Sequence, residues 1–116
     1  MLQPFYREAE SGGLRYFSGL SLDVLEALIR EDFVEMGPWN TCDGVEELFL
    51  PFLRRNPKFT AHGYAVMPGR PDLRVTIEGV EQDGPMTTDE IIDFALTFRG
   101  ADEMDLDPDW ARCWYD

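Results

Sequence analysis

The chain has 116 residues, of which 44% are apolar, including eight phenylalanines, four tyrosines and three tryptophans. This is enough apolar material for the core of one domain, and it excludes an intrinsically disordered chain. The 23 acidic and 10 basic residues give a net charge of -13, which argues against direct binding to nucleic acid or to an anionic membrane and favours a basic protein surface as the partner.

Two further classes of protein are excluded by what the sequence lacks. No apolar run approaches the roughly 20 residues of a membrane-spanning helix, and no basic and apolar leader follows Met1. We therefore expect a soluble intracellular protein, cytoplasmic or nuclear. Because Cys42 and Cys113 lie far apart and form no metal-ligand spacing, we predict neither a zinc site nor a disulfide, and no cofactor.

The first helix is predicted in the segment SLDVLEALIR, residues 21–30. Leucine and isoleucine recur there at helical spacing, and Ser21 is placed to cap the first turn. The helix should end near Asp32, and a short strand is expected at residues 33–36, before a turn at a Gly-Pro pair.

A second helix is predicted in the segment DGVEELFLPFL, residues 43–53. Asp43 and Glu46 have the spacing of a capping box, and the apolar residues form one helical face. Pro51 removes a backbone donor, so the helix either kinks there or restarts with Pro51 in a new first turn.

From Lys58 onward the apolar period changes to two, which is typical of strands. We expect strands at 58–67, 73–79, 89–98 and 110–116, a bulge at Gly79-Val80, and an acidic loop at 100–109. No repeat or linker interrupts the chain, so residues 1–116 should form a single domain. The order predicts an α+β fold in which N-terminal helices pack on a strongly curved, mostly antiparallel sheet.

Several segments together carry a resemblance to a known superfamily. They are LDVLEALIREDFVEMG, DGVEELFLPFL, HGYAVMPGRPDLRVTIEGVEQDG, IIDFALTF and WARCWYD. In order, length and hydrophobicity they resemble the helices and strands of the nuclear transport factor 2-like superfamily. The resemblance implies a cystatin-like cone, and it leaves the function open because this superfamily hosts both enzymes and protein-interaction modules.

The enzymes of the superfamily, such as ketosteroid isomerase, move protons with acidic, histidine and tyrosine side chains inside the cone. The resemblance therefore makes His62, Asp93 and Tyr64 the candidate catalytic residues. Strand parity puts Asp93 on the face opposite the aromatic Phe94 and Phe98, which indicates a surface or interface carboxylate. His62 is the sole histidine, and a lone histidine in a strand is more often a hydrogen-bonded structural residue than a catalyst.

The interaction modules of the superfamily use the open face of the sheet to pair with another chain. The predicted interface gathers side chains on the outer face of the late strands: Ile91, Asp93, Ala95, Thr97, Trp110, Arg112 and Trp114. We therefore predict a non-catalytic protein-interaction module that forms a homodimer or a heterodimer through its sheet face. The resemblance implies a role of the accessory type in nuclear transport or messenger-RNA export.

Two alternatives remain open. One is a small-molecule-binding or proton-transfer enzyme, similar to an isomerase or a dehydratase, with its site in the cone interior. It predicts a pocket lined by polar groups near His62 and Tyr64, whereas a module predicts a filled interior and an exposed apolar face. The other is an acidic decoy of a nucleic-acid-binding surface, which predicts carboxylates at phosphate spacing in the acidic loop: Asp102, Glu103, Asp105, Asp107 and Asp109.

Overall fold

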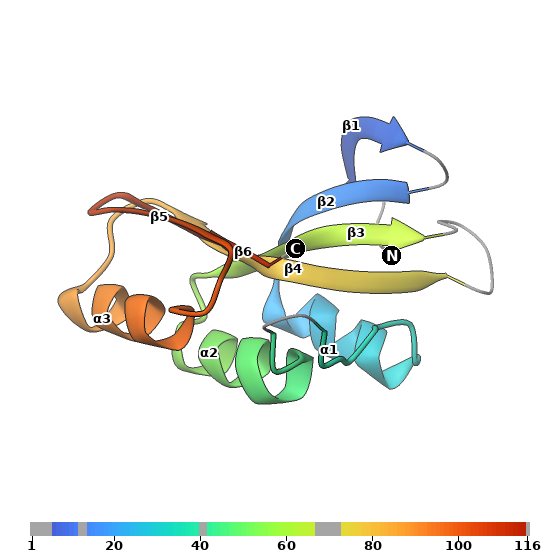
Figure 1. Ribbon diagram of the computed structural model, residues 1–116, viewed down its shortest axis with the longest axis horizontal. Coiled ribbons are helices and arrows are strands. Elements are labelled where there is room, and N and C mark those ends of the chain that lie inside the picture. The colour runs from blue at the N-terminus through green and yellow to red at the C-terminus, as the bar shows by residue number, and fades with distance from the viewer. Residues whose placement is uncertain (1–5, 12–13, 40–41, 67–72, 116) are drawn as a thin grey trace.

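The computed structural model describes residues 6–11, 14–39, 42–66 and 73–115. In chain order the elements are β1 (Tyr6–Ser11), β2 (Leu14–Leu20), α1 (Leu22–Arg30), η2 (Val45–Phe49), α2 (Leu50–Arg55), β3 (Thr60–Val66), β4 (Arg74–Asp83), α3 (Thr88–Thr97), β5 (Glu103–Asp107) and β6 (Trp110–Trp114). The six strands form one sheet in the order β1-β2-β3-β4-β6-β5, and every neighbouring pair is antiparallel. Helices α1, α2 and α3 lie beneath one face of this sheet (Figure 1). The predicted α+β class is confirmed.

Helix α1 forms where its capping residue and apolar spacing predict it. Ser21 accepts a hydrogen bond from the Val24 amide, and Leu25 and Leu28 are buried against the sheet. The strand expected at 33–36 is reduced to a single parallel bridge between Val34 and Val75.

The second helix is built in two parts around its proline. A π-helical turn, η2, runs directly into α2, and Pro51 lies in the first turn of α2. Of the two predicted alternatives, the one observed is a new helix with Pro51 in its first turn, where the missing backbone N–H of proline removes no hydrogen bond. The predicted capping box at Asp43 is wrong, since the residue before the helical turn is Gly44 and no side chain caps it.

Strands β3 and β4 pair along their length except at one bulge. His62 pairs with Gly79 and Gly63 pairs with Ile77, so Glu78 is the extra residue on β4. The bulge predicted next to Gly79 is therefore confirmed, within one residue of its expected place.

The segment predicted as a strand at 89–98 is a helix instead. It forms α3, which begins with a capping box: Thr87 accepts from the Glu90 amide, and the Glu90 side chain accepts from the Thr87 amide. Phe94 and Phe98, four positions apart, are buried together. The helical period of the apolar residues, fixed by this cap, overrides the alternation that suggested a strand.

Two other predictions about element order are wrong. Residues 103–107, expected within an acidic loop, form strand β5, because they pair with β6 across a tight connection at Pro108. Strands β1 and β2 precede the first helix, so the first described elements are strands and not helices.

None of the helices in the described ranges is both long and apolar enough to span a membrane.

Phenylalanine side chains fill the space between the helices and the sheet. Phe52 on α2 lies at the centre of this cluster, with ring centroids 4.7 Å from Phe98 and 4.8 Å from Phe59. Phe49 and Phe94 complete the cluster, and all five rings are buried. Edge-to-face and stacked contacts of this kind stabilise a close-packed core.

Candidate functional site

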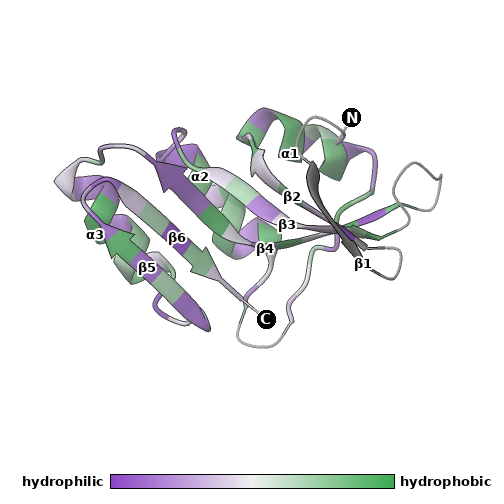
Figure 2. Cartoon of the chain, turned by 90° about the horizontal axis from the view of Figure 1, so that it is seen from above, coloured by the Kyte–Doolittle hydropathy of each residue, from purple (hydrophilic) through white to green (hydrophobic). Residues whose placement is uncertain are grey.

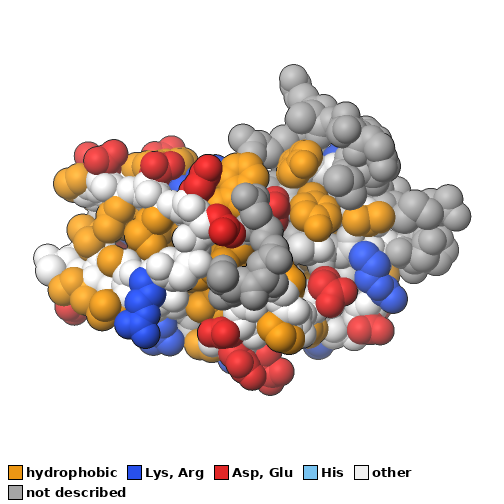
Figure 3. Space-filling model, in the orientation of Figure 1, with side chains coloured by type: hydrophobic (Ala, Val, Ile, Leu, Met, Phe, Trp, Pro, Cys, Tyr) orange, Lys and Arg blue, Asp and Glu red, His pale blue; other side chains and the backbone are white. Residues whose placement is uncertain are grey.

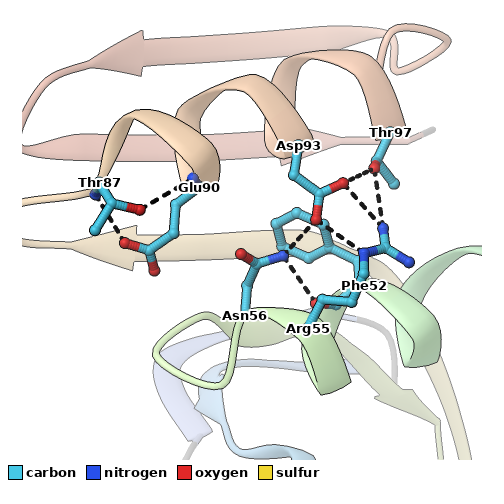
Figure 4. A network of polar contacts seen from close by, with 7 residues as sticks. All are labelled: Phe52, Arg55, Asn56, Thr87, Glu90, Asp93 and Thr97. Carbon is cyan, nitrogen blue, oxygen red and sulfur yellow. Dashed lines mark hydrogen bonds and ion pairs between the residues drawn. The ribbon is translucent and has the colours of Figure 1, made fainter.

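Asp93 lies at the junction between α3 and α2, where four donor groups surround its carboxylate (Figure 4). Arg55 donates from Nε to Oδ2 at 2.9 Å and from Nη2 to Oδ1 at 3.0 Å. Asn56 donates to Oδ2 at 2.7 Å, and the Thr97 hydroxyl donates to Oδ1 at 2.9 Å. The network joins the two helices through a bidentate charged pair, which is the strong geometry for arginine and carboxylate.

This network gives Asp93 a structural role. The hydrogen bonds from Arg55, opposed by partial burial and reinforced by Asn56 and Thr97, lower the pKa of Asp93 from 3.8 to about 2. A carboxylate with so low a pKa and so many donors is a poor proton acceptor near neutral pH. Asp93 therefore holds α3 against α2 and is not placed to act as a general base.

Replacing Asp93 with asparagine should lower the free energy of unfolding by about 1 to 2 kcal/mol at pH 7. Water weakens the attraction between the two charges, because the Arg55 side chain is 51% exposed, and the expected loss is therefore small. Since the pKa of Asp93 is lower in the folded state, this stabilisation is fully present above about pH 5 and is lost as the pH falls towards 2. Urea unfolding of both proteins between pH 7 and pH 2 measures it.

The matched control for this experiment is Asp89→Asn, which changes an exposed carboxylate in the first turn of the same helix. It should cost less than Asp93→Asn at pH 7, because Asp89 is exposed and interacts favourably with the helix dipole but has no hydrogen-bonded network like that of Asp93 among the described residues. A difference between wild type and Asp93→Asn that stays constant down to pH 2 would contradict the assigned network.

The structure separates the three candidate catalytic residues. His62 and Tyr64 lie on the face of β3 that points away from the helices, since the residues that flank them, Ala61 and Ala65, enter the core. Asp93 lies on the opposite, helical side of the sheet. No common site can therefore use all three.

His62 is nearly fully buried, with 2% of its surface exposed. Its Nε2 atom lies 2.8 Å from the Cys113 carbonyl oxygen and donates to it, and its ring contacts that of Trp114. Tyr64 instead packs edge-on against Tyr16 of the neighbouring strand β2. These contacts are those of a hydrogen-bonded structural histidine and of a cross-strand aromatic pair.

The residues predicted on β6 lie on the open face of the sheet. Trp110, Arg112 and Trp114 alternate there with side chains that enter the core. Arg112 pairs with Glu81 at 3.6 Å and lies over the Trp114 ring, and the Trp114 indole donates to Glu78. The predicted interface residues Ile91, Asp93, Ala95 and Thr97 belong to α3 instead, so the predicted set is divided between two faces of the molecule.

The exposed apolar side chains gather at the end of the molecule formed by α3 and β5. Among the described residues, four large apolar side chains are exposed: Ile92 (50%), Leu96 (61%), Met104 (36%) and Leu106 (37%). Met104 and Leu106 pair with residues of β6 that enter the core, so they point to the side of the sheet where α3 lies. We name these four residues the α3–β5 patch; hydrophobic atoms gather between the two elements in Figure 3.

Sequence reasoning missed all four residues of this patch. The strand predicted at 89–98 placed Ile92 and Leu96 on the same face as Phe94 and Phe98, which was expected to be buried. Met104 and Leu106 were assigned to an acidic loop, for which no buried or exposed face was predicted. Two signals could have found them: the spacing of Thr87 and Glu90, which predicts a helix start, and the alternation in EMDLD, which predicts a strand.

The other face of β5 is acidic. Glu103, Asp105 and Asp107 lie opposite Trp114, Arg112 and Trp110 of β6 and share their face of the sheet: the pairs are Glu103–Trp114, Asp105–Arg112 and Asp107–Trp110. None of the three carboxylates has an ion pair within the described part of the chain. Figure 2 shows the resulting alternation of hydrophilic and hydrophobic residues along β5.

The cysteines show no sign of nucleophilic or metal-binding chemistry. Cys42 and Cys113 are both free and buried, and burial raises the pKa of the Cys113 thiol to about 12. A thiol with this pKa is not a thiolate near neutral pH. In residues 6–11, 14–39, 42–66 and 73–115, no group of three His, Cys, Asp or Glu side chains could hold a metal ion.

Comparison of the chain with protein-family models, with curated proteins and with solved structures finds no match in any of the three. The fold and the surfaces described above are therefore the basis for any functional conclusion.

Proposed function

We propose that this protein is a non-catalytic protein-interaction module that binds another chain through the α3–β5 patch. The observation that carries the proposal is the concentration of the exposed large apolar side chains on these two adjacent elements. Several exposed large apolar side chains grouped at one end of a protein are typical of a protein-binding site. This location replaces the open sheet face, where Arg112 and Trp114 are already held by neighbouring side chains.

Two further observations favour a module over a proton-transfer or small-molecule-binding enzyme. Phenylalanine rings occupy the space between helices and sheet where the enzymes of the predicted superfamily would hold a substrate. His62 and Asp93 each donate or accept hydrogen bonds within the fold. The interior therefore supports packing, and the exposed end supports recognition.

The acidic decoy is supported by the row of carboxylates on β5, which lie roughly 6.8 Å apart along a strand. A decoy of nucleic acid, however, has no use for Met104 and Leu106 on the other face of the same strand. Protein binding accounts for both faces of β5, so we rank it first.

The cone of the nuclear transport factor 2-like superfamily stays a prediction for this chain. Helices that cover one face of an antiparallel sheet support it. The two strands before α1, and α3 between β4 and β5, depart from the order of elements that the sequence predicted. The proposed interaction rests on the exposed side chains and does not depend on membership of this superfamily.

A displayed library of random 16-residue peptides, selected on the wild-type protein, tests the proposed function. Selected ligands should bind Leu96→Asp at least about tenfold more weakly, because a charge within an apolar contact surface is strongly unfavourable. The control is Arg30→Ala, which changes the net charge by the same one unit at an exposed position on α1. A selection without enrichment, or ligands that bind Leu96→Asp as well as wild type, would overturn the proposal.

A further inference from the structure

Strand β5 is a free edge of the sheet. Its neighbour in the sheet is β6, and no described strand pairs with its other side. All five of its residues are exposed. The outward N–H and C=O groups of such a strand are a ready template for pairing with a further extended segment.

The two faces of β5 specify what an added strand would need. Residues opposite Glu103, Asp105 and Asp107 would meet three carboxylates, and the intervening residues would meet Met104, Leu106 and the side where α3 lies. Because side chains alternate along a strand, a complementary segment has basic residues at every second position and apolar residues between them. The alternation of side chains on β5 thus defines the sequence pattern of a complementary strand as well as its charge.

The charge of β5 also decides between a partner and a second copy of this chain. If two copies paired antiparallel through β5 about Asp105, each Asp105 would face the other, and each Glu103 would face the Asp107 of the other copy. Like charges directly opposite each other destabilise a strand pair, and the net charge of -13 on each chain adds repulsion. A basic segment gains attraction at the same positions.

We infer that the β5 edge binds an extended segment of another protein in which basic and apolar residues alternate, as an added strand of the sheet. The inference rests on the proposed function, because it names the partner of the α3–β5 patch. The basic side chains contact Glu103, Asp105 and Asp107, while the apolar side chains cover Met104 and Leu106. Backbone hydrogen bonds to β5 supply the part of the affinity that depends on an extended conformation.

The test uses a labelled seven-residue peptide in which lysine or arginine alternates with valine, with fluorescence anisotropy as the readout. A scrambled peptide of the same composition, with its basic residues grouped, should bind about tenfold more weakly at moderate salt. Two further peptides carry N-methyl groups, one on every basic residue and the other on every valine. Because alternate amides of an added strand point towards β5, one of these peptides should bind like the parent and the other should lose binding.

Protein variants locate the binding. Asp105→Asn should weaken the alternating peptide about threefold to tenfold and should reduce the salt dependence of its affinity. Glu31→Gln removes the same charge at an exposed position at the end of α1 and should leave binding almost unchanged. Circular dichroism confirms that both variants fold.

Each outcome bears on a different step of the inference. Equal binding of both methylated peptides, or of the scrambled peptide, would mean charge attraction without an added strand and would overturn the inference. A wild-type dimer in light scattering that Leu106→Asp dissociates would overturn it in favour of a second copy. If the alternating peptide fails while library ligands still depend on Leu96, the named partner is wrong and the interaction module stands; if neither binds, both proposals fall.

Discussion

Phe52→Ala is expected to lower the free energy of unfolding by about 3 to 5 kcal/mol, which is a large share of the stability of a small domain. Phe52 is fully buried, and its ring contacts those of Phe59, Phe94 and Phe98. These partners come from α3 and from the segment before β3, so the cavity left by alanine would loosen the contacts of α2 with both. Partial collapse of three rigid rings into that cavity would recover little of the loss.

Urea unfolding followed by circular dichroism measures this change. Leu96→Ala is the control, because Leu96 is 61% exposed and its replacement should change stability by no more than about 0.5 kcal/mol. Should Phe52→Ala not fold, Phe52→Leu provides a smaller cavity and an intermediate value. A Phe52→Ala effect equal to that of Leu96→Ala would show that the aromatic cluster is not the core.

Local signals in the sequence predicted those elements whose start, break or bulge is set by one or two residues of the element itself. Ser21 marks the start of α1, and the missing amide of Pro51 divides the second helix. The alternation in LRVTIEG predicts β4, and its slip near Gly79 predicts the bulge. In each case the feature acts through the backbone of its own segment, so tertiary contacts were not needed to find it.

The failures occurred where a segment satisfied two periods at once. In residues 89–98, Phe94 and Phe98 fit the inner face of either a strand or a helix, while Ile92 and Leu96 are inside for one and outside for the other. The capping box decides between them: Thr87 lies just before the segment and Glu90 within its first turn, so the segment begins as a helix. Strand β5 is a different case, because its acidic residues have low strand propensity and pairing with β6 holds it extended.

The candidate interface could be predicted only in part from residue types. Aromatic and arginine side chains near the C-terminus suggested a binding surface, but the fold uses Trp114 to contact His62 and Arg112 to pair with Glu81. Asp93, assigned to the interface by strand parity, faces Arg55 instead. Such contacts join residues that are far apart in the sequence. The sequence alone therefore could not predict that these side chains have partners within the fold.

Gly79→Ala should lower the free energy of unfolding by about 3 kcal/mol, although alanine is otherwise better than glycine in a strand. A Cβ atom at this position would overlap the Cys113 carbonyl oxygen and would lie 2.7 Å from His62 Nε2. The obstacle is backbone of β6, which cannot turn aside as a flexible side chain could. Gly19→Ala is the control: Gly19 has a φ of 74° but no atom within 4 Å of an added Cβ, so it should cost only about 1 to 2 kcal/mol.

The double variant His62→Ala/Gly79→Ala identifies which of the two contacts requires the glycine. His62 donates to the same Cys113 oxygen that the new Cβ would meet, so its removal clears one contact and leaves the other. We therefore expect His62→Ala to restore little of the stability lost in Gly79→Ala, as measured by the coupling energy of a double-mutant cycle in urea. A full recovery would mean that the imidazole, and not the β6 backbone, limits this position. Little recovery would mean that the Cys113 carbonyl group of β6, which approaches β4 closely here, requires a glycine at position 79.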